Sequence, residues 1–291
     1  NQVQDPTLIE GCTAYVSLEP CSHFGRTPPC ADLLVAKKVG RVVICHVDTN
    51  PQVGGKGIAK LREAGIEVET GLLEPNGRWI NRRFLAHMEK QRPHIILKWA
   101  QTADGFIARS NYDSKWISGP LARKLVHKWR SEEDAILVGR HTAAQDNPRL
   151  TARDWEGVNP TRVVIDRFAK LPSDLHLFDQ QVPTICYTLG KTGEQKNLAF
   201  VALSEEHFWE ELLTDLYTRK QQSLIVEGGT VVFEQLLQRG YWDEARIFTA
   251  PKRFGTGIAA PNVTGTVVSE QQIAQDTLTI LANPRNVSLP Q

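Results

Sequence analysis

Hydrophobic and polar positions along the first ninety residues follow a strand–helix order. Short apolar runs rich in Val, Ile and Leu predict strands, and stretches whose apolar residues recur every three or four positions predict helices. The alternation of strand and helix favours a parallel sheet covered by helices. The predicted strands span residues 13–18, 41–47 and 66–70, the predicted helices span residues 31–38 and 56–64, and a longer helix spans residues 76–90.

A second set of elements begins directly after Gln91-Arg92-Pro93, which we interpret as the domain boundary. A chain of 291 residues is long enough for two domains, each with its own core. The predicted fold class is therefore α/β, with one domain over residues 1–91 and a second over residues 92–291. The second domain has predicted strands over residues 94–100, 135–139, 162–166, 184–187, 223–226 and 244–250, helices over residues 121–130, 208–219 and 230–238, and an edge strand near residues 277–281 in a polar tail.

The charge and cysteine content exclude several classes of protein. A net charge of +1 gives no electrostatic footprint for nucleic acid or a membrane surface, so we expect neither as a partner. The apolar runs are too short to span a bilayer. Five cysteines are an odd number in a chain that is large enough to fold without disulfides, which favours a reducing compartment and a cytoplasmic protein.

Residues 20–30, Pro-Cys-Ser-His-Phe-Gly-Arg-Thr-Pro-Pro-Cys, place two cysteines between a predicted strand and a predicted helix. Thiolates at this position can bind zinc, and the start of a helix favours their negative charge. A structural zinc site needs four protein ligands, whereas a catalytic site needs three and an open position for water. Cys21 and Cys30 would supply two metal ligands. His23 could supply a third only with strain, because it lies so close to Cys21.

Zinc deaminases carry a His-x-Glu element upstream of such a cysteine pair, and its glutamate moves protons between zinc-bound water and substrate. No His-x-Glu element precedes Cys21, and the chain begins at Asn1 rather than at a methionine. We therefore expect the third ligand and the glutamate to lie upstream of Asn1.

The eight residues between the two cysteines form a predicted loop beside the metal site. His23 and Arg26 in this loop can bind an anion, which favours a phosphorylated small molecule over a polynucleotide as the substrate. Arg26 can also be read as an ordinary solvated surface residue.

Motifs across nearly the whole chain resemble one family. The first domain carries residues 19–30, EPCSHFGRTPPC, and residues 50–57, NPQVGGKG. The second domain carries KWAQTADG at residues 98–105, DSKWIS at 113–118, DNPRLTAR at 146–153, VEGGT at 226–230 and APK at 250–252. In this order they resemble the bifunctional deaminase/reductase of bacterial riboflavin biosynthesis.

The resemblance implies a cytidine-deaminase-like domain, N-terminally incomplete here, followed by a dihydrofolate-reductase-like domain. It implies zinc-dependent hydrolytic deamination of a phosphoribosylaminopyrimidine, then NADPH-dependent reduction of its ribosyl group to ribityl, in a homo-oligomer (dimer or tetramer). The implied substrate contacts are Asn50, Ser114, Arg130, Leu150 and Arg153, and the implied cofactor contacts are Ala100, Trp116, Thr142 and Thr230. Without the resemblance, Arg130 would read as an ordinary cation at the C-terminal end of a helix.

Three side chains are candidates for the chemistry of reduction. Carboxylates near an electrophilic carbon can stabilise positive charge and manage a proton, and we assign this role to Asp146 and Glu227, with Asp146 also placed in the cofactor site. Glu227 follows an apolar strand, at the edge where α/β proteins bind ligands, and we also expect it to contact substrate. Asp146 can also be read as a turn former. Lys98 lies in an apolar strand, where an ammonium group is costly unless it reaches a crevice or a partner.

The residues after Glu227 are suited to a cofactor phosphate. Gly228 and Gly229 precede a predicted helix, whose first backbone N–H groups can bind a pyrophosphate. Arg167 follows another predicted strand, where a cation can meet the 2′-phosphate of NADPH, although a bland surface role is equally open.

Two other readings are open. The chain can be a reductase alone, with the first domain a zinc-free scaffold. It can also be a non-catalytic or RNA-binding deaminase-like module, which the near-neutral charge disfavours.

Overall fold

The computed structural model describes residues 3, 5–25, 27–51, 53–114 and 117–289. Contacts divide the chain into two compact units, one that includes the described residues up to Lys90 and one over Gln91–Asn286. Residues 287–289 belong to the first unit, where Arg78 Nε donates a hydrogen bond to Ser288 Oγ at 3.2 Å. The expected second domain over residues 92–291 therefore extended too far at its C-terminal end.

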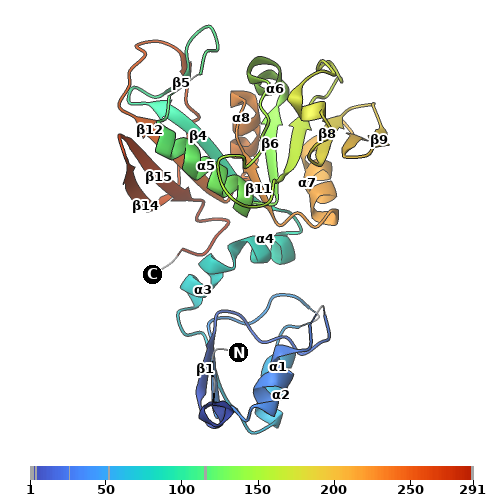
Figure 1. Cartoon of the computed structure of the whole chain (residues 1–291), viewed down its shortest axis with the longest axis vertical. Coiled ribbons are helices and arrows are strands. Elements are labelled where there is room, and N and C mark those ends of the chain that lie inside the picture. The colour runs from blue at the N-terminus through green and yellow to red at the C-terminus, as the bar shows by residue number, and fades with distance from the viewer. Residues whose placement is uncertain (1–2, 4, 26, 52, 115–116, 290–291) are drawn as a thin grey trace. The chain divides into compact units, whose positions relative to one another are not determined.

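The first unit contains a three-stranded parallel sheet, as the alternating pattern predicted (Figure 1). Val42, Ile44, Ile58 and Leu61 form the centre of its core, because the buried face of each helix packs against the apolar strands. Its elements are η1 (Pro6–Ile9), β1 (Thr13–Val16), α1 (Cys30–Ala36), β2 (Arg41–Ile44), α2 (Lys56–Glu63) and β3 (Glu67–Thr70).

The single helix predicted over residues 76–90 is wrong, because the structure has two helices, α3 (Glu74–Ile80) and α4 (Arg82–Lys90). Asn81 separates them. Its side-chain Nδ2 lies 3.1 Å from the Gly77 carbonyl oxygen and 3.2 Å from the Ser17 carbonyl oxygen. Such side-chain bonds to the backbone compete with a continuous helix, and hydrophobic spacing does not reveal them.

The buried carboxylate of Glu19 organises the loop that leads into α2. Glu19 is 3% exposed and accepts four backbone hydrogen bonds. Its Oε2 accepts from the N–H groups of Asp48 and Gly55, and its Oε1 accepts from those of Gly57 and Ile58, at 2.9 to 3.2 Å. An acidic side chain at a helix N-terminus satisfies donors that the helix itself leaves unpaired.

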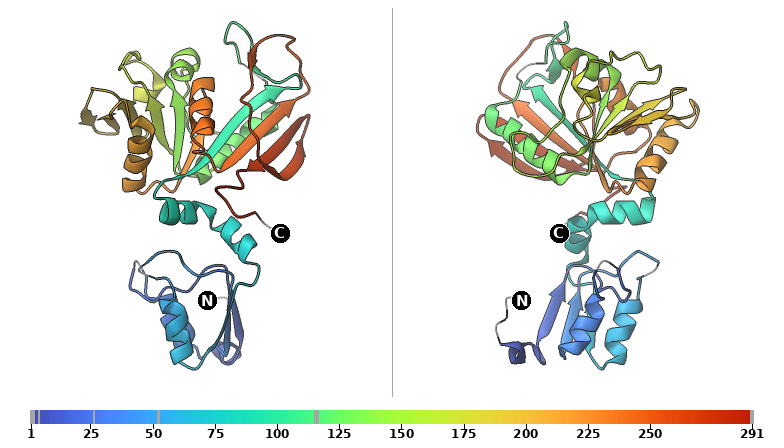
Figure 2. Two further views of the ribbon diagram at one scale, coloured as in Figure 1. Left: turned by 180° about the vertical axis from the view of Figure 1, so that it is seen from behind. Right: turned by 45° about the vertical axis from the view of Figure 1, so that its right-hand side comes forward.

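The second unit is built on a ten-stranded mixed sheet in the order β14-β15-β12-β4-β11-β6-β7-β8-β10-β9. Figure 2 shows that this sheet is twisted and has helices on both sides. The strands are β4 (His94–Thr102), β6 (Ala135–Gly139), β7 (Thr161–Ile165), β8 (Thr184–Thr188), β9 (Gly193–Gln195), β10 (Leu198–Ala202), β11 (Ser223–Val226), β12 (Glu244–Ala250), β14 (Thr266–Ile273) and β15 (Asp276–Ala282), and β5 (Phe106–Ala108) pairs separately with β13 (Ile258–Ala259).

Two cores cover the two faces of this sheet. Helices α7 (Phe208–Thr218) and α8 (Thr230–Gln238) pack in one cluster with Ile95 and Leu97. Helices α5 (Pro120–Glu132) and α6 (Arg140–Asp146) pack in the other with Ile96, as does the short η2 (His176–Phe178). Neighbouring residues of β4 therefore face opposite layers, which explains the continuous apolar runs of the central strands.

The predicted edge strand near residues 277–281 is wrong in one respect. It forms β15, but β15 pairs with β12 on one side and with β14 on the other, so β14 is the edge strand. Most residues of β14 are exposed or half-buried, and the strand therefore carries too little apolar alternation to be seen in the sequence.

The described residues include no helix with both the length and the apolar character needed to cross a membrane.

Candidate functional site

A cavity of about 820 Å³ lies at the carboxyl ends of neighbouring parallel strands in the second unit. Strands β4, β11, β6 and β7 run side by side in parallel, so residues that follow them in the sequence meet at one edge. The cavity brings together twelve of the predicted site residues: Lys98, Ala100, Ser114, Arg130, Thr142, Asp146, Arg153, Arg167, Glu227, Gly228, Gly229 and Thr230.

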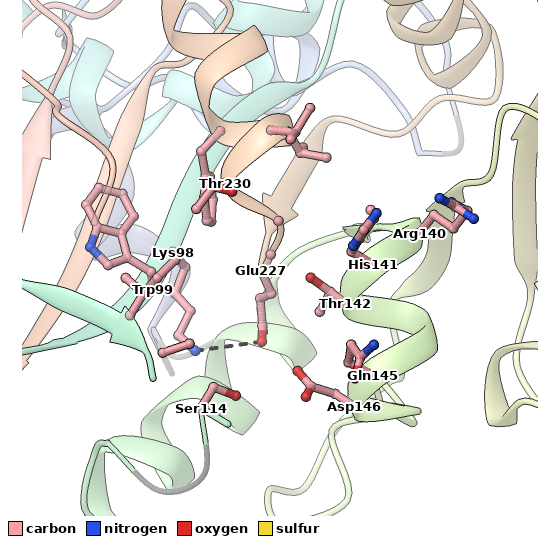
Figure 3. Close-up of a pocket in the computed structure, with 18 of the residues that line it drawn as sticks. Lys98, Trp99, Ser114, Arg140, His141, Thr142, Gln145, Asp146, Glu227 and Thr230 are labelled. Atoms are coloured by element: carbon pink, nitrogen blue, oxygen red, sulfur yellow. Dashed lines mark ion pairs between the residues drawn. The ribbon is translucent and has the colours of Figure 1, made fainter. Parts of the chain in front are cut away.

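An ionic cluster of Glu227, Arg130 and Lys98 occupies one end of the cavity. Arg130 donates two hydrogen bonds to Glu227, from Nε to Oε1 at 2.8 Å and from Nη2 to Oε2 at 2.7 Å. Lys98 Nζ lies 3.7 Å from Glu227 Oε2 (Figure 3). The Glu227 side chain is 7% exposed, so this carboxylate is shielded from bulk water and held by two cations.

The charges of this cluster shift the proton affinities of its members. Burial alone would raise the pKa of the Glu227 carboxyl, but Arg130 and Lys98 outweigh it and hold the pKa at about 2. Burial lowers the pKa of the Lys98 ammonium, and the Glu227 carboxylate opposes that shift. Glu227 is therefore ionised at neutral pH, and Lys98 gives up its proton more readily than a surface lysine does.

Ser114 and Asp146 face the same space. Figure 3 shows their side chains directed toward Glu227 and Lys98. Asp146 is the last residue of α6, and the next residue, Asn147, has φ +40 and turns the chain away. The alternative of Asp146 as a turn former is thus compatible with its place on the cavity wall.

Side chains are disfavoured at both positions of the Gly228-Gly229 turn, by crowding at the first and by backbone conformation at the second. A Cβ on Gly228 would lie 2.8 Å from both Cγ2 and Oγ1 of Thr142, and Gly229 has φ +90. The turn leads directly into α8, whose first backbone N–H groups are free of intrahelical partners. Two residues without side chains, on the cavity wall and at the start of a helix, fit a cofactor phosphate.

His127 was missed by sequence reasoning. It lies on the cavity wall, and its Nε2 is 3.1 Å from Asp154 Oδ2. Burial, followed by the nearby Arg130 guanidinium, lowers the pKa of His127. The only sequence signal was its position three residues before Arg130 on the same helix face, which places both side chains at the cavity.

Two predicted residues of the second unit, Leu150 and Trp116, are not placed on this cavity. Leu150 is 2% exposed in the core cluster of α5 and α6, and it does not line the cavity. Trp116 and Arg26 lie outside the residues that the structure describes.

The first unit brings together the two predicted metal ligands. The backbone N–H of Cys30, the first residue of α1, lies 3.4 Å from Cys21 Sγ. Burial and the adjacent Cys21 thiol raise the pKa of the Cys30 thiol. Two of the predicted substrate contacts of this unit lie on loops. His23 is exposed on the loop between the two cysteines. Asn50 lies in the loop before α2, where its carbonyl oxygen accepts hydrogen bonds from the N–H groups of Val53 and Gly54. Among the described residues no group of three or more His, Cys, Asp or Glu side chains could hold a metal ion, so these residues fit half of a zinc site.

Comparison with known proteins places the chain in a family. The family model "RibD C-terminal domain" matches residues 93–281. The chain is 38% identical over 256 residues to the riboflavin biosynthesis protein RibD of Aquifex aeolicus. This match covers 86% of this chain and 72% of that protein. It is 38% identical over 279 residues to the protein of the same name from Synechocystis, covering 94% of this chain and 76% of that protein.

The crystal structure of a diaminohydroxyphosphoribosylaminopyrimidine deaminase/5-amino-6-(5-phosphoribosylamino)uracil reductase from Thermotoga maritima superposes with a TM-score of 0.85 at 36% identity. The match covers 94% of this chain and 80% of that chain. With the mixed sheet and the cavity, these matches define the second unit as a reductase domain with a dihydrofolate-reductase-like fold. The chain belongs to the RibD family of riboflavin biosynthesis proteins.

Proposed function

We propose that the second unit reduces the ribosyl group of a phosphoribosylaminopyrimidine to ribityl with NADPH. The observation that carries this proposal is one cavity that contains both the Glu227–Arg130–Lys98 cluster and the bare glycine turn before α8. The Glu227 carboxylate of the cluster suits a carbon that develops positive charge, and the glycine turn suits a dinucleotide phosphate.

The residues of the cluster have separate roles in this proposal. When bound, the reduced nicotinamide supplies the hydride. The Glu227 carboxylate stabilises the cation-like carbon that forms when the sugar ring opens, because it is ionised and shielded from water. Lys98 gives a proton to the released ring oxygen, a role that its lowered pKa favours. Asp146 assists this proton transfer from the opposite wall of the cavity, facing Lys98 and Glu227.

The remaining residues of the wall position the two ligands. Ser114 and Arg153 hold the substrate phosphate, since a hydroxyl and a guanidinium group are strong donors to phosphate oxygens. The Arg130 guanidinium is already bonded to Glu227 and to the Thr151 carbonyl oxygen, so Arg130 acts by positioning Glu227. Thr142, Thr230 and the two glycines hold the cofactor phosphates.

Arg167 faces the 2′-phosphate of NADPH in this arrangement. Its guanidinium lies 4.6 Å from the ring centroid of Phe208, on the cavity wall. A guanidinium fixed on an aromatic face is a ready partner for a phosphate monoester.

The proposal is tested by following the oxidation of NADPH by the purified chain in the presence and absence of the phosphoribosylaminopyrimidine substrate. We expect oxidation only with substrate present, and a lower rate with NADH because NADH lacks the phosphate that Arg167 meets. An equal rate with both cofactors would contradict the role of Arg167. No substrate-dependent oxidation with either would contradict the function.

A second activity, zinc-dependent deamination of the same class of substrate, is favoured by one observation, the juxtaposition of Cys21 and Cys30. The name of the Thermotoga protein also includes a deaminase. We propose that the first unit is the deaminase-like part of the protein. Its chemistry needs a third metal ligand and a proton-transferring glutamate that the described residues do not supply. Without that ligand and that glutamate, the first unit is a zinc-free scaffold.

We expect a protein made of residues 1–291 alone to hold far less than one zinc ion per molecule after desalting, because two thiols alone bind zinc weakly. Elemental analysis by mass spectrometry measures this content, with the Cys21→Ser variant as the matched control. One tightly held equivalent of zinc that disappears in Cys21→Ser would contradict this expectation and support a complete deaminase site.

A further inference from the structure

The cavity extends well beyond the ionic cluster. Glu227 follows β11, Arg140 follows β6, and Phe168 lies three residues after the end of β7. Phe168 is therefore three strands away from Lys98 on β4 in the sheet order. Neighbouring strands lie about 4.8 Å apart, so the cavity wall spans roughly 14 Å between these two residues. A substrate the size of a single sugar phosphate would leave the Phe168 end empty.

Phe168 is an unusual residue for a surface. Its ring is 65% exposed, yet it lies on the cavity wall. Val231, the second residue of α8, adds another apolar side chain to the same wall and is 66% exposed. Large apolar side chains that stay exposed inside a cavity indicate a ligand with an apolar or aromatic surface.

The turn that carries Phe168 is held in place by hydrogen bonds. Asp166 is 1% exposed, and its Oδ2 accepts from the backbone N–H of Leu171 at 2.8 Å. Its carbonyl oxygen accepts from the N–H of Ala169, and the Arg167 carbonyl oxygen accepts from Leu189 N–H at 2.7 Å. The exposed ring is thus presented by a fixed backbone, which reduces the entropy lost when a ligand binds.

The charge at this end of the cavity is positive. Arg140 and Arg167 both line it, and Lys170 Nζ lies 5.6 Å from the centroid of the Phe168 ring. The acidic side chains among the lining residues, Asp146 and Glu227, lie at the other end. Helix α6 places Arg140 at its first residue and Asp146 at its last, about 9 Å apart along the helix.

We propose that Phe168 stacks on the adenine ring of the bound cofactor and, with Val231, forms its adenine subsite. An aromatic ring beside cations matches the adenosine 2′,5′-bisphosphate half of NADPH, which joins a planar base to phosphates. The inference rests on the proposed function, since it requires a dinucleotide whose other end reaches Glu227.

Calorimetric titration of the Phe168→Ala variant tests this assignment with three probes: NADPH, adenosine 2′,5′-bisphosphate and reduced nicotinamide mononucleotide. Loss of one base–aromatic stack is expected to weaken binding of the first two about tenfold. Binding of the mononucleotide, which lacks adenine, should be unchanged. The Phe168→Trp variant should keep the affinity of the wild type for all three.

The Phe24→Ala variant is the matched control, because Phe24 is 79% exposed in the first unit and does not line the cavity. Equal affinity of Phe168→Ala and wild type for both adenine-containing probes would overturn the adenine subsite while leaving the proposed function intact. Failure of the wild type to bind NADPH would overturn both. Equal weakening for all three probes would also overturn the subsite, since it would indicate a general disturbance of the cavity.

Discussion

The Glu227→Gln substitution is expected to lower kcat for reduction by about 100- to 10,000-fold, the range typical of losing a charged group that acts in the transition state. Glutamine keeps the shape of the side chain but removes the negative charge. Arg130 and Lys98 would then face the reacting carbon without a counter-charge. Steady-state kinetics at saturating cofactor and substrate measures the effect.

The matched control is Glu234→Gln, an exposed carboxylate on α8 that does not line the cavity. Thermal melts of both variants distinguish lost chemistry from lost folding, since removing one partner of a buried ion pair costs about 3–5 kcal/mol of stability. A folded Glu227→Gln enzyme with the turnover of the wild type would remove Glu227 from the chemistry.

The Gly228→Ala substitution is expected to weaken NADPH binding about 30-fold. The new Cβ would meet the Thr142 side chain at 2.8 Å, so Thr142 or the start of α8 has to shift, and both hold the cofactor phosphates in the proposed site. Loss of two hydrogen bonds to these phosphates corresponds to about 2 kcal/mol. Fluorescence or calorimetric titration with NADPH measures the dissociation constant.

Gly190→Ala provides the comparison for this variant. A Cβ on Gly190 meets no atom within 4 Å, so the same added methyl group should leave NADPH affinity unchanged. Unaltered affinity in Gly228→Ala would show that the glycine turn does not approach the cofactor.

The central elements of the second unit could be predicted from sequence with the bounds that the structure shows. Strands β6, β11 and β12 and helix α8 are of this kind, because buried parallel strands and one-faced helices leave strong hydrophobic patterns. The edge strand β14 and the break between α3 and α4 left no such pattern. The residues of β14 are exposed or half-buried, and the break between α3 and α4 depends on hydrogen bonds of the Asn81 side chain.

Part of the candidate site could also be predicted from the sequence. The position of Glu227 after an apolar strand and before two glycines was sufficient to single it out. Its pairing with Arg130 was not, since the two residues are 97 positions apart and meet only through the order of strands in the sheet. His127 was hidden for a related reason, because a histidine on a mostly apolar helix face looks like an ordinary core residue.

Glu19 lies two positions before Cys21, at the start of the segment that carries the two candidate metal ligands. Each of its oxygens already serves two amide donors of the α2 loop. Removing this carboxylate would leave those donors unpaired and loosen the loop. Replacement of Glu19 should therefore lower the melting temperature of the protein, because four buried N–H groups would lose their acceptor.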